Sequence, residues 1–354
     1  MRNVSKSLSS LFAVLLFVTL ACSSVCVSPS FAKCIDEIVV FGDSLSDTGN
    51  LYFATTPTDA NSDSVQMPKS PPYYLGRFSN GLVWVEYLAM AMGLEVPAPS
   101  LLGGTNYAWG GAETGNGISI HNTPNIGTQI QSFLVSDSPK DNQLFILWAG
   151  ANDIHNHDDP NPQEIVNNII EHIRTLALAS LDETLKLMIP NLPTLGQTAR
   201  ARCLGSETSW IFDGISIEFN IILGRELNKL KKELKAYNSK ELILYRLDIL
   251  SFFQEMFTYP ETFGFTNVSE TVRMSTDDLG CPLGVTSVPD EEELVDNPDE
   301  YILFDDIHPT TAVHKLIAER ALEIIFNQNI KGHVEFRNYF KYLRNRIFYR
   351  CFSN

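Results

Sequence analysis

Basic residues are scarce in this chain of 354 residues, which carries 26 Lys and Arg against 42 Asp and Glu. The formal net charge of −16 argues against a nucleic-acid partner, because so acidic a surface would repel phosphates. Neutral lipids and glycans remain open as ligands. Hydrophobic residues make up 44% of the chain and charged residues 19%, a balance that excludes a disordered chain and favours a compact globular protein.

Long hydrophobic runs are missing as well. The apolar stretch over residues 11–21 is too short to span a bilayer comfortably, and it follows the basic residues Arg2 and Lys6. Together with small residues further on, this pattern predicts a signal peptide over residues 1–32. We therefore expect an exported protein, either secreted or periplasmic. An uncleaved anchor and a lipoprotein signal at Cys22 are the alternatives.

Cysteine is sparse, with six residues in all, and two of them leave with the predicted leader. The remaining part has no close Cys-x-x-Cys pair, which disfavours a structural zinc site. Four cysteines in an exported chain predict two disulfides in one of three pairings. We favour Cys203–Cys281, which would brace the region between the last strand of the sheet and His308. Cys34–Cys351 would then tie the two ends of the chain together.

Two short motifs suggest nucleophilic chemistry. An apolar run stops at Gly42 and is followed by Ser44, which predicts a strand–turn–helix junction with a hydroxyl at its tip. Serine is a poor nucleophile until a base takes its proton. Far downstream, Asp305 and His308 are close enough in sequence for one turn to hold the carboxylate against the imidazole. Ser44, His308 and Asp305 therefore form a predicted catalytic triad, without the Gly-x-Ser-x-Gly elbow of α/β-hydrolases.

Four sequence blocks, in this order, resemble the GDSL family of esterases and lipases, also called SGNH hydrolases. They are Gly42-Asp43-Ser44-Leu45, Gly104-Thr105-Asn106-Tyr107-Ala108-Trp109-Gly110-Gly111-Ala112, Gly150-Ala151-Asn152-Asp153 and Asp305-Asp306-Ile307-His308-Pro309. The similarity runs from about residue 35 to about residue 328. The first block continues to Asp47-Thr48-Gly49-Asn50, a long form similar to the branch that contains bacterial phospholipases, glycerophospholipid:cholesterol acyltransferases and many plant lipases.

The resemblance also implies an oxyanion hole. Its donors would be the backbone N–H groups of Ser44 and Gly111 and the side-chain amide of Asn152, with Gly110 as the neighbouring choice if the register differs by one. The chemistry permits these roles, because N–H groups at a helix start are unpaired and glycine lets a backbone come close. Each residue also has an ordinary alternative: Ser44 as a helix cap, Asn152 and the glycines as turn residues, and His308 as a loop histidine.

Histidine and aspartate also cluster over residues 153–159, with two His and three Asp. Such a set could bind a cation, but an exposed polar loop explains it as well. We predict no metal and no cofactor. His314 lies in the final expected helix and is expected to be a packing residue and not a metal ligand.

Strand-like and helix-like segments alternate, which predicts a three-layer α/β/α sandwich with a central five-stranded parallel sheet, of the SGNH-hydrolase, flavodoxin-like kind. The expected strands are residues 35–41, 105–108, 144–148, 185–189 and 242–247. The expected helices are residues 81–93, 165–179, 209–236 and 312–326.

One hydrolase domain is expected over residues 33–330. Residues 255–303 break the alternation and predict an insertion over the active site, either a solvated loop or a flap that an activating protease could clip. Residues 331–354 interleave basic and aromatic side chains. This C-terminal extension would either make peripheral contact with a membrane or pack as a terminal helix.

The leading functional hypothesis is an exported serine esterase that cleaves lipid esters, as a phospholipase A or lysophospholipase, through an acyl-enzyme on Ser44. A sterol could accept the acyl group in place of water. A deacetylase of carbohydrates or small esters is the alternative on the same site. A non-catalytic binding protein on the same fold is the alternative of another class, which the intact set of Ser44, Asn152, Asp305 and His308 disfavours.

Overall fold

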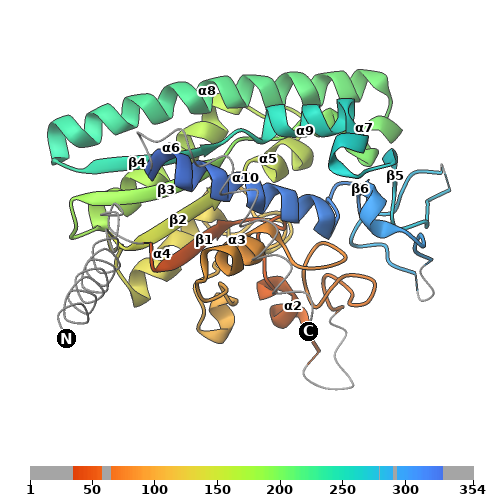
Figure 1. The fold of residues 1–354 in the computed structure, drawn as a ribbon, viewed down its shortest axis with the longest axis horizontal. Helices are drawn as coiled ribbons and strands as arrows, with labels where there is room; N and C mark the ends of the chain where they lie inside the picture. The colour runs from red at the N-terminus through yellow and green to blue at the C-terminus, as the bar shows by residue number, and fades with distance from the viewer. Residues whose placement is uncertain (1–34, 58–64, 279, 290–292, 330–354) are drawn as a thin grey trace, which may run out of the picture. The chain divides into compact units, whose positions relative to one another are not determined.

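The computed structural model describes residues 35–57, 65–278, 280–289 and 293–329 (Figure 1). Its centre is a parallel sheet of four strands in the order β1-β2-β3-β4, with β1 at Glu37–Gly42, β2 at Gln143–Trp148, β3 at Thr184–Pro190 and β4 at Glu241–Leu247. Gly42 pairs with Trp148, and Pro190 pairs with Leu247. The carboxyl ends of the strands therefore meet along one edge, where open α/β sheets bind their ligands.

The prediction of α/β architecture with a parallel sheet is confirmed, but the count of five strands is wrong. Residues 105–108 form no strand, although they lie along the free edge of β1. Val40 donates its N–H to the carbonyl of Thr105 (3.0 Å) and accepts the N–H of Tyr107 (2.7 Å). Asn106 also forms a bridge to Pro99 and turns its own side chain onto the N–H of Ala108. The two contacts of Asn106, to Pro99 and to Ala108, draw the segment out of regular strand geometry.

Helices cover both faces of the sheet, because alternate side chains of each strand point to opposite sides. Val39 and Phe41 pack with α4 (Ile126–Ser136), α6 (Pro162–Ala179) and α8 (Ser206–Asn238). Ile38 and Val40 pack on the other face with α3 (Trp84–Met92), α9 (Ile249–Thr258) and α10 (Thr311–Asn329). All four expected helices are present, and α8 is the longest of the described part, at 33 residues (Figure 1).

Local sequence explains where several helices begin and end. Asn161 caps α6, since its side chain accepts the N–H groups of Gln163 and Glu164, and Pro162 occupies the first helical position. At the other end of α3, Gly93 adopts a left-handed conformation with φ of 71° and stops the helix.

The segment over residues 255–303 contains the end of α9, followed by η3 (Pro260–Phe263), β5 (Asn267–Thr271), η4 (Pro298–Glu300) and β6 (Tyr301–Leu303). β5 and β6 form a small parallel sheet of their own. The favoured disulfide Cys203–Cys281 is confirmed, and its Cα atoms are 5.7 Å apart. It ties this segment to α7 (Ala199–Cys203).

The expected signal peptide, the Cys34–Cys351 pairing and the basic–aromatic extension lie outside the described residues. Within the described part, no helix combines the length and the apolar character needed to cross a membrane.

Candidate active site

The serine lies directly behind the carboxyl end of β1. Gly42 is required there, because a Cβ at this position would come within 2.8 Å of the Trp148 carbonyl on the neighbouring strand. The side-chain amide of Gln129 holds the same residue, accepting its N–H and donating to its carbonyl, both at 2.9 Å. These contacts fix the point from which the chain turns to present Ser44.

The helix expected to begin at Ser44 is replaced by one turn. The N–H groups of Ser46 and Asp47 donate to the Asp43 carbonyl at 3.0 Å, and the next helix, α2 (Asn50–Thr55), begins only later. The carboxylate of Asp47 explains the interruption, since it accepts the N–H groups of Gly49 (2.7 Å) and Asn50 (2.6 Å). Gly49 adopts φ of 129°, which also breaks a continuous helix.

The structure brings together the three residues of the predicted triad. His308 Nε2 lies 2.8 Å from Ser44 Oγ, and His308 Nδ1 lies 2.8 Å from Asp305 Oδ2. All three are buried, with Ser44 8%, His308 3% and Asp305 0% exposed. The imidazole also packs against the ring of Phe78, with ring centroids 5.2 Å apart. This is the geometry in which a base can take the proton of a nucleophile while a carboxylate orients that base.

Asp305 stays ionised in this buried position. Burial acts to raise its pKa, but the charge of His308 and hydrogen bonds from His308 and Tyr73 outweigh burial and lower the pKa to about 2. Its Oδ1 accepts the backbone N–H groups of Ile307 (2.9 Å) and His308 (2.6 Å). The backbone turn therefore fixes one carboxylate oxygen and leaves the other for the imidazole.

The proposed oxyanion donors lie close to the serine or beside one another. Ser44 and Asn152 line one pocket, and Asn152 Nδ2 donates to the Ala112 carbonyl at 2.9 Å, next to Gly111. Gly111 is not among the residues that line the pocket; it adopts φ of 77°, and a Cβ there would lie 3.0 Å from the His121 side chain. The N–H of Gly110, the alternative oxyanion donor, already donates a hydrogen bond to Asp47 Oδ2 at 3.0 Å.

Asp47 is a site residue for which the sequence reasoning assigned no role. It is fully buried, and its carboxylate joins the turn after Ser44 to the glycine block through Gly110. Burial raises the pKa of Asp47 to about 6, against the hydrogen bonds that it accepts. Asp153 has a similar role beside Asn152, since it accepts the N–H (3.0 Å) and hydroxyl (2.6 Å) of Thr114. The long form of the first block was the available signal for Asp47.

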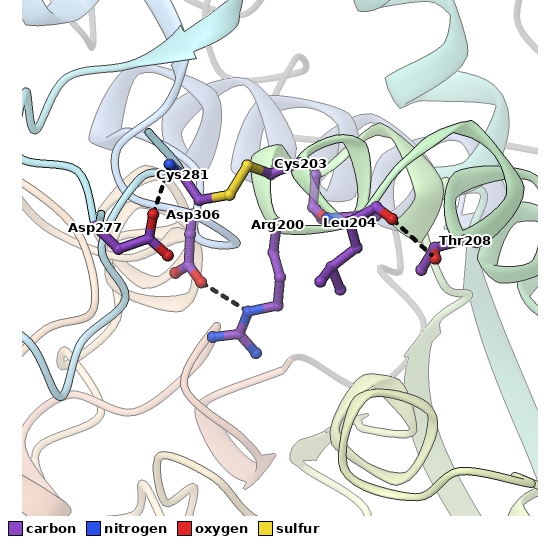
Figure 2. The surroundings of a disulfide bond; sticks show 9 residues. Arg200, Cys203, Leu204, Thr208, Asp277, Cys281 and Asp306 are labelled. Carbon is purple, nitrogen blue, oxygen red and sulfur yellow. Dashed lines mark hydrogen bonds and ion pairs between the residues drawn. A yellow bond between two sulfur atoms is a disulfide. The ribbon is translucent and has the colours of Figure 1, made fainter. Parts of the chain in front are cut away.

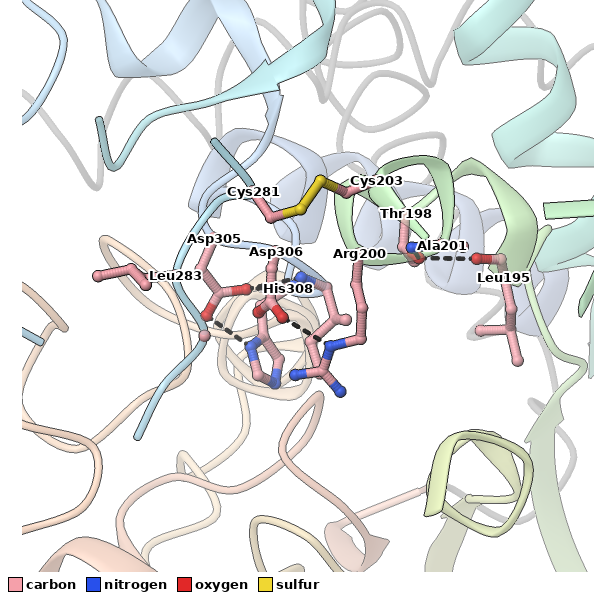
Figure 3. A network of polar contacts seen from close by, with 12 residues as sticks. Leu195, Thr198, Arg200, Ala201, Cys203, Cys281, Leu283, Asp305, Asp306 and His308 are labelled. Carbon is pink, nitrogen blue, oxygen red and sulfur yellow. Dashed lines mark hydrogen bonds and ion pairs between the residues drawn. A yellow bond between two sulfur atoms is a disulfide. The ribbon is translucent and has the colours of Figure 1, made fainter. Parts of the chain in front are cut away.

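The disulfide lies close to the Asp-x-x-His turn, as Figures 2 and 3 show. Arg200, on α7, donates from Nε to Asp306 Oδ2 at 2.7 Å, and its backbone N–H donates to the Asp306 carbonyl at 2.9 Å. Asp306 directly follows Asp305, so Arg200 attaches α7 to the Asp-x-x-His turn, while Cys203 attaches α7 to the 255–303 segment. Figure 3 shows Arg200 and Asp306 beside Asp305 and His308.

The pocket in front of Ser44 is small and mostly apolar. Its volume is about 50 Å³. His155 lines it, and burial lowers the pKa of this histidine to about 4, so the ring is neutral at neutral pH. The apolar lining comes from the turn after β1, the end of β2, α5 (Ala151–Asn156), the start of η2 (Leu195–Gln197) and the loop before it, α9, and the end of β6 with the loop that follows it: Leu45, Trp148, Ala151, Pro193, Leu195, Phe253, Phe257, Leu303, Ile307 and Pro309.

The other singled-out residues have structural contacts. His314 is fully buried in α10, as expected, and its Nδ1 accepts the backbone N–H of Trp84 at 3.3 Å. In the 153–159 cluster, Asp153 is bound by Thr114, while His157 lies 3.4 Å from Glu113. Among the described residues, no group of His, Cys, Asp and Glu is arranged to hold a metal ion.

Comparisons with known proteins identify the family of this chain. A family model described as GDSL-like lipase/acylhydrolase matches residues 38–321. The thermolabile hemolysin of Vibrio parahaemolyticus serotype O3:K6 is 28% identical over 82% of this chain, which spans 63% of that relative. The phosphatidylcholine-sterol acyltransferase of Aeromonas hydrophila is 28% identical over 85% of this chain and 92% of its own length. A solved member of the lipolytic G-D-S-L family from Veillonella parvula is 15% identical, covers 81% of this chain and 96% of its own, and has a TM-score of 0.37.

The extent of the family match makes the class plain. The chain belongs to the GDSL-like lipase/acylhydrolase family. It is therefore a serine hydrolase that acts on ester bonds, with an α/β fold built on a parallel sheet.

Proposed function

We propose that Ser44 attacks the carbonyl carbon of a carboxylic ester while His308 Nε2 takes its proton. The carbonyl oxygen becomes an oxyanion, and collapse of this tetrahedral species breaks the bond to the alcohol, which leaves with the proton from His308. An acyl-enzyme on Ser44 remains. Water, deprotonated by the same imidazole, then releases the carboxylic acid and restores the serine. The observation that carries this proposal is the pair of 2.8 Å contacts that His308 makes to Ser44 and Asp305.

The oxyanion in both steps needs donors that already point at it, because a preorganised donor requires no rearrangement when charge develops. The proposed donors are the N–H groups of Ser44 and Gly111 and the amide of Asn152. One amide hydrogen of Asn152 is bound by the Ala112 carbonyl. That bond holds the side chain in place and leaves the second hydrogen of Nδ2 for the oxyanion.

Lipid esters are the proposed substrates, as for a phospholipase A or lysophospholipase. The apolar pocket lining supports this class, because a fatty acyl chain forms no hydrogen bonds and binds best against apolar side chains. The similarity to a phosphatidylcholine-sterol acyltransferase supports it further and adds a sterol as a possible acceptor. The acyl-enzyme permits both outcomes, because either water or a sterol hydroxyl can attack it.

A short acyl group is favoured by a different observation. The pocket measures about 50 Å³, far below the ~150 Å³ of an engineered cavity that binds benzene. An acetyl group fits such a space, whereas a long chain would have to continue along the open side. A deacetylase of carbohydrates or small esters is therefore the second candidate.

Export through a cleaved leader, peripheral membrane contact by residues 331–354 and activation by proteolysis of the 255–303 segment remain proposals. Phe257 and Leu303, which lie near the two ends of that segment, line the pocket, so a change in the segment would reach the substrate.

The test compares wild type, S44A and S46A on p-nitrophenyl esters from acetyl to palmitoyl. Ser46 is a matched control, because it lies in the same turn, is fully buried and bonds Trp84 Nε1 at 3.1 Å instead of the imidazole. We expect S44A to lose hydrolysis and S46A to keep it. Wild type without hydrolysis, or S44A at full rate, would reject the enzyme in favour of a binding protein.

A second experiment separates the substrate classes. Phosphatidylcholine vesicles with and without cholesterol are incubated with the enzyme, and free fatty acid and sterol ester are measured together. Fatty acid alone indicates hydrolysis of lipids, and sterol ester indicates acyl transfer. Activity restricted to acetyl esters would contradict the lipid proposal and favour the deacetylase.

A further inference from the structure

One oxygen of Asp305 is shared between two donors. Oδ2 accepts His308 Nδ1 at 2.8 Å, and it also accepts the phenol of Tyr73 at 2.5 Å. Tyr73 is 2% exposed, and its ring packs edge-on against Phe304 with centroids 5.1 Å apart. The hydroxyl is therefore held on the carboxylate by a packed ring and does not reach it from a mobile surface loop.

The direction of the phenol proton follows from Arg273. Its guanidinium Nη1 donates to Tyr73 Oη at 2.9 Å, and its Cζ lies 5.4 Å from the centre of the Tyr73 ring. Because Oη accepts from Arg273, the phenol hydrogen is directed at Asp305. Burial first, and then the charge of Asp305, raise the pKa of Tyr73 well above its usual value, so the phenol keeps this hydrogen.

Arg273 is itself fixed in place. It is 1% exposed, and its guanidinium donates to the carbonyls of Leu283 (3.1 Å), Gly284 (3.1 Å) and Ser287 (3.2 Å). Its backbone N–H donates to the carbonyl of Phe304 at 3.0 Å, directly before Asp305. The disulfide at Cys281 anchors the start of the loop that supplies these carbonyls.

We propose that Tyr73, oriented by Arg273, is a positioning residue that weakens the hold of Asp305 on the protonated form of His308. A donor on Oδ2 draws electron density from the bond to His308 Nδ1, and the cation behind it acts in the same sense. The carboxylate then pairs less strongly with the imidazole once it has taken the serine proton. The hydroxyl also fixes the orientation of the carboxylate.

The other charged and titratable groups around His308 are Asp43 from the β1 turn, His155 from α5 (Ala151–Asn156), His314 from α10, and Asp306 with its partner Arg200. None of these groups takes part in the proposed effect. The effect concerns only the contact from Tyr73 to Asp305, and it rests on the proposed esterase mechanism.

The test uses Y73F, which removes the hydroxyl and keeps the ring. Y87F is the matched control, since it also deletes a phenol bond, here to Thr311 Oγ1 at 2.8 Å and not to a triad residue. We expect the acid limb of kcat/KM against pH to move to higher pH by about 0.5 to 1 unit in Y73F. Y87F should keep the wild-type limb. R273K keeps a positive charge but loses the several N–H donors of the guanidinium. It should shift the acid limb in the same direction, by a smaller amount.

A second readout does not depend on activity. In the S44A background, the His308 ring protons are titrated by NMR in the presence and in the absence of the additional substitution Y73F. The midpoint should rise on adding Y73F, which would support the positioning role even if the esterase proposal failed. An unchanged midpoint and an unchanged acid limb, with only kcat or thermal stability lowered, would show a merely structural role and overturn the inference. So would equal shifts in Y73F and Y87F.

Discussion

Replacing Asn152 by Ala tests the proposed oxyanion hole most directly. In the structure its Nδ2 lies 2.9 Å from the Ala112 carbonyl, so one amide hydrogen is engaged and the other remains for the developing charge. Losing one such donor costs roughly 3–4 kcal/mol of transition-state stabilisation, or about 10²–10³ in kcat. Stability should change much less, because the lost bond to Ala112 contributes only about 1 kcal/mol.

The assay is steady-state hydrolysis of a p-nitrophenyl ester, with thermal unfolding measured on the same preparations. N156A provides the control. Asn156 lies on the same helix, donates from Nδ2 to Glu113 Oε1 at 2.9 Å, and does not line the pocket. We expect N152A to lose kcat with KM nearly unchanged, and N156A to retain it. N152D should be at least as slow as N152A, because a carboxylate cannot donate and would repel the oxyanion.

Retention of kcat within about threefold in N152A would contradict the assignment, since no donor of the strength expected here could then have been lost. An equal loss in N156A would point to a general disturbance of α5. A rise in KM at constant kcat would mean that the amide binds the ground state and the transition state equally.

Three further outcomes concern stability. C203S or C281S should lower the free energy of unfolding by up to roughly 4–5 kcal/mol, because the bridge closes a separation of 78 residues; denaturant titration, with reductant on wild type as a check, measures this. G42A should destabilise by about 1–3 kcal/mol, since its Cβ would meet a neighbouring carbonyl at 2.8 Å, whereas G224A, with open space around it, should be neutral or stabilising. His314 has a pKa lowered to about 3 by burial, so the unfolded chain binds the extra proton first and stability should fall as pH drops from about 6.5 towards 3; H314N, which keeps an acceptor, should flatten that dependence, and an unchanged slope would contradict it.

The proposed reactive groups were accessible to sequence reasoning because local signals mark them. Gly42 stops an apolar run, and His308 follows Asp305 within one turn, so short spacings carry the information. Position at the carboxyl ends of parallel strands then brings such segments together in any open α/β sheet. The favoured pairing of Cys203 with Cys281 succeeded on similar grounds of position.

The supporting contacts could not be predicted in this way. Tyr73 and Asp305 are separated by 232 residues, and Arg273 lies 200 residues from Tyr73. Nothing in the local sequence around these three residues specifies the two contacts. The contact of Arg273 with Tyr73 depends on how the 255–303 segment packs. Asp47 was visible within the first block, but its bond to Gly110 crosses 63 positions and required the fold.

The errors have a common origin in side chains that compete with regular structure. The strand expected at residues 105–108 fails because Asn106 bonds the backbone locally, and the helix expected at Ser44 fails because Asp47 captures the N–H groups that would extend it. Asn and Asp side chains commonly offer the backbone such alternatives. Helix and strand propensities and hydrophobic periodicity do not reveal these side-chain hydrogen bonds to the backbone.

The 264 positions between serine and imidazole also bear on synthesis. A chain still emerging from the ribosome displays its hydroxyl long before it possesses a proton acceptor for it. On the proposed mechanism, the nascent polypeptide is therefore inert towards esters until translation has passed His308 and the final helix has docked.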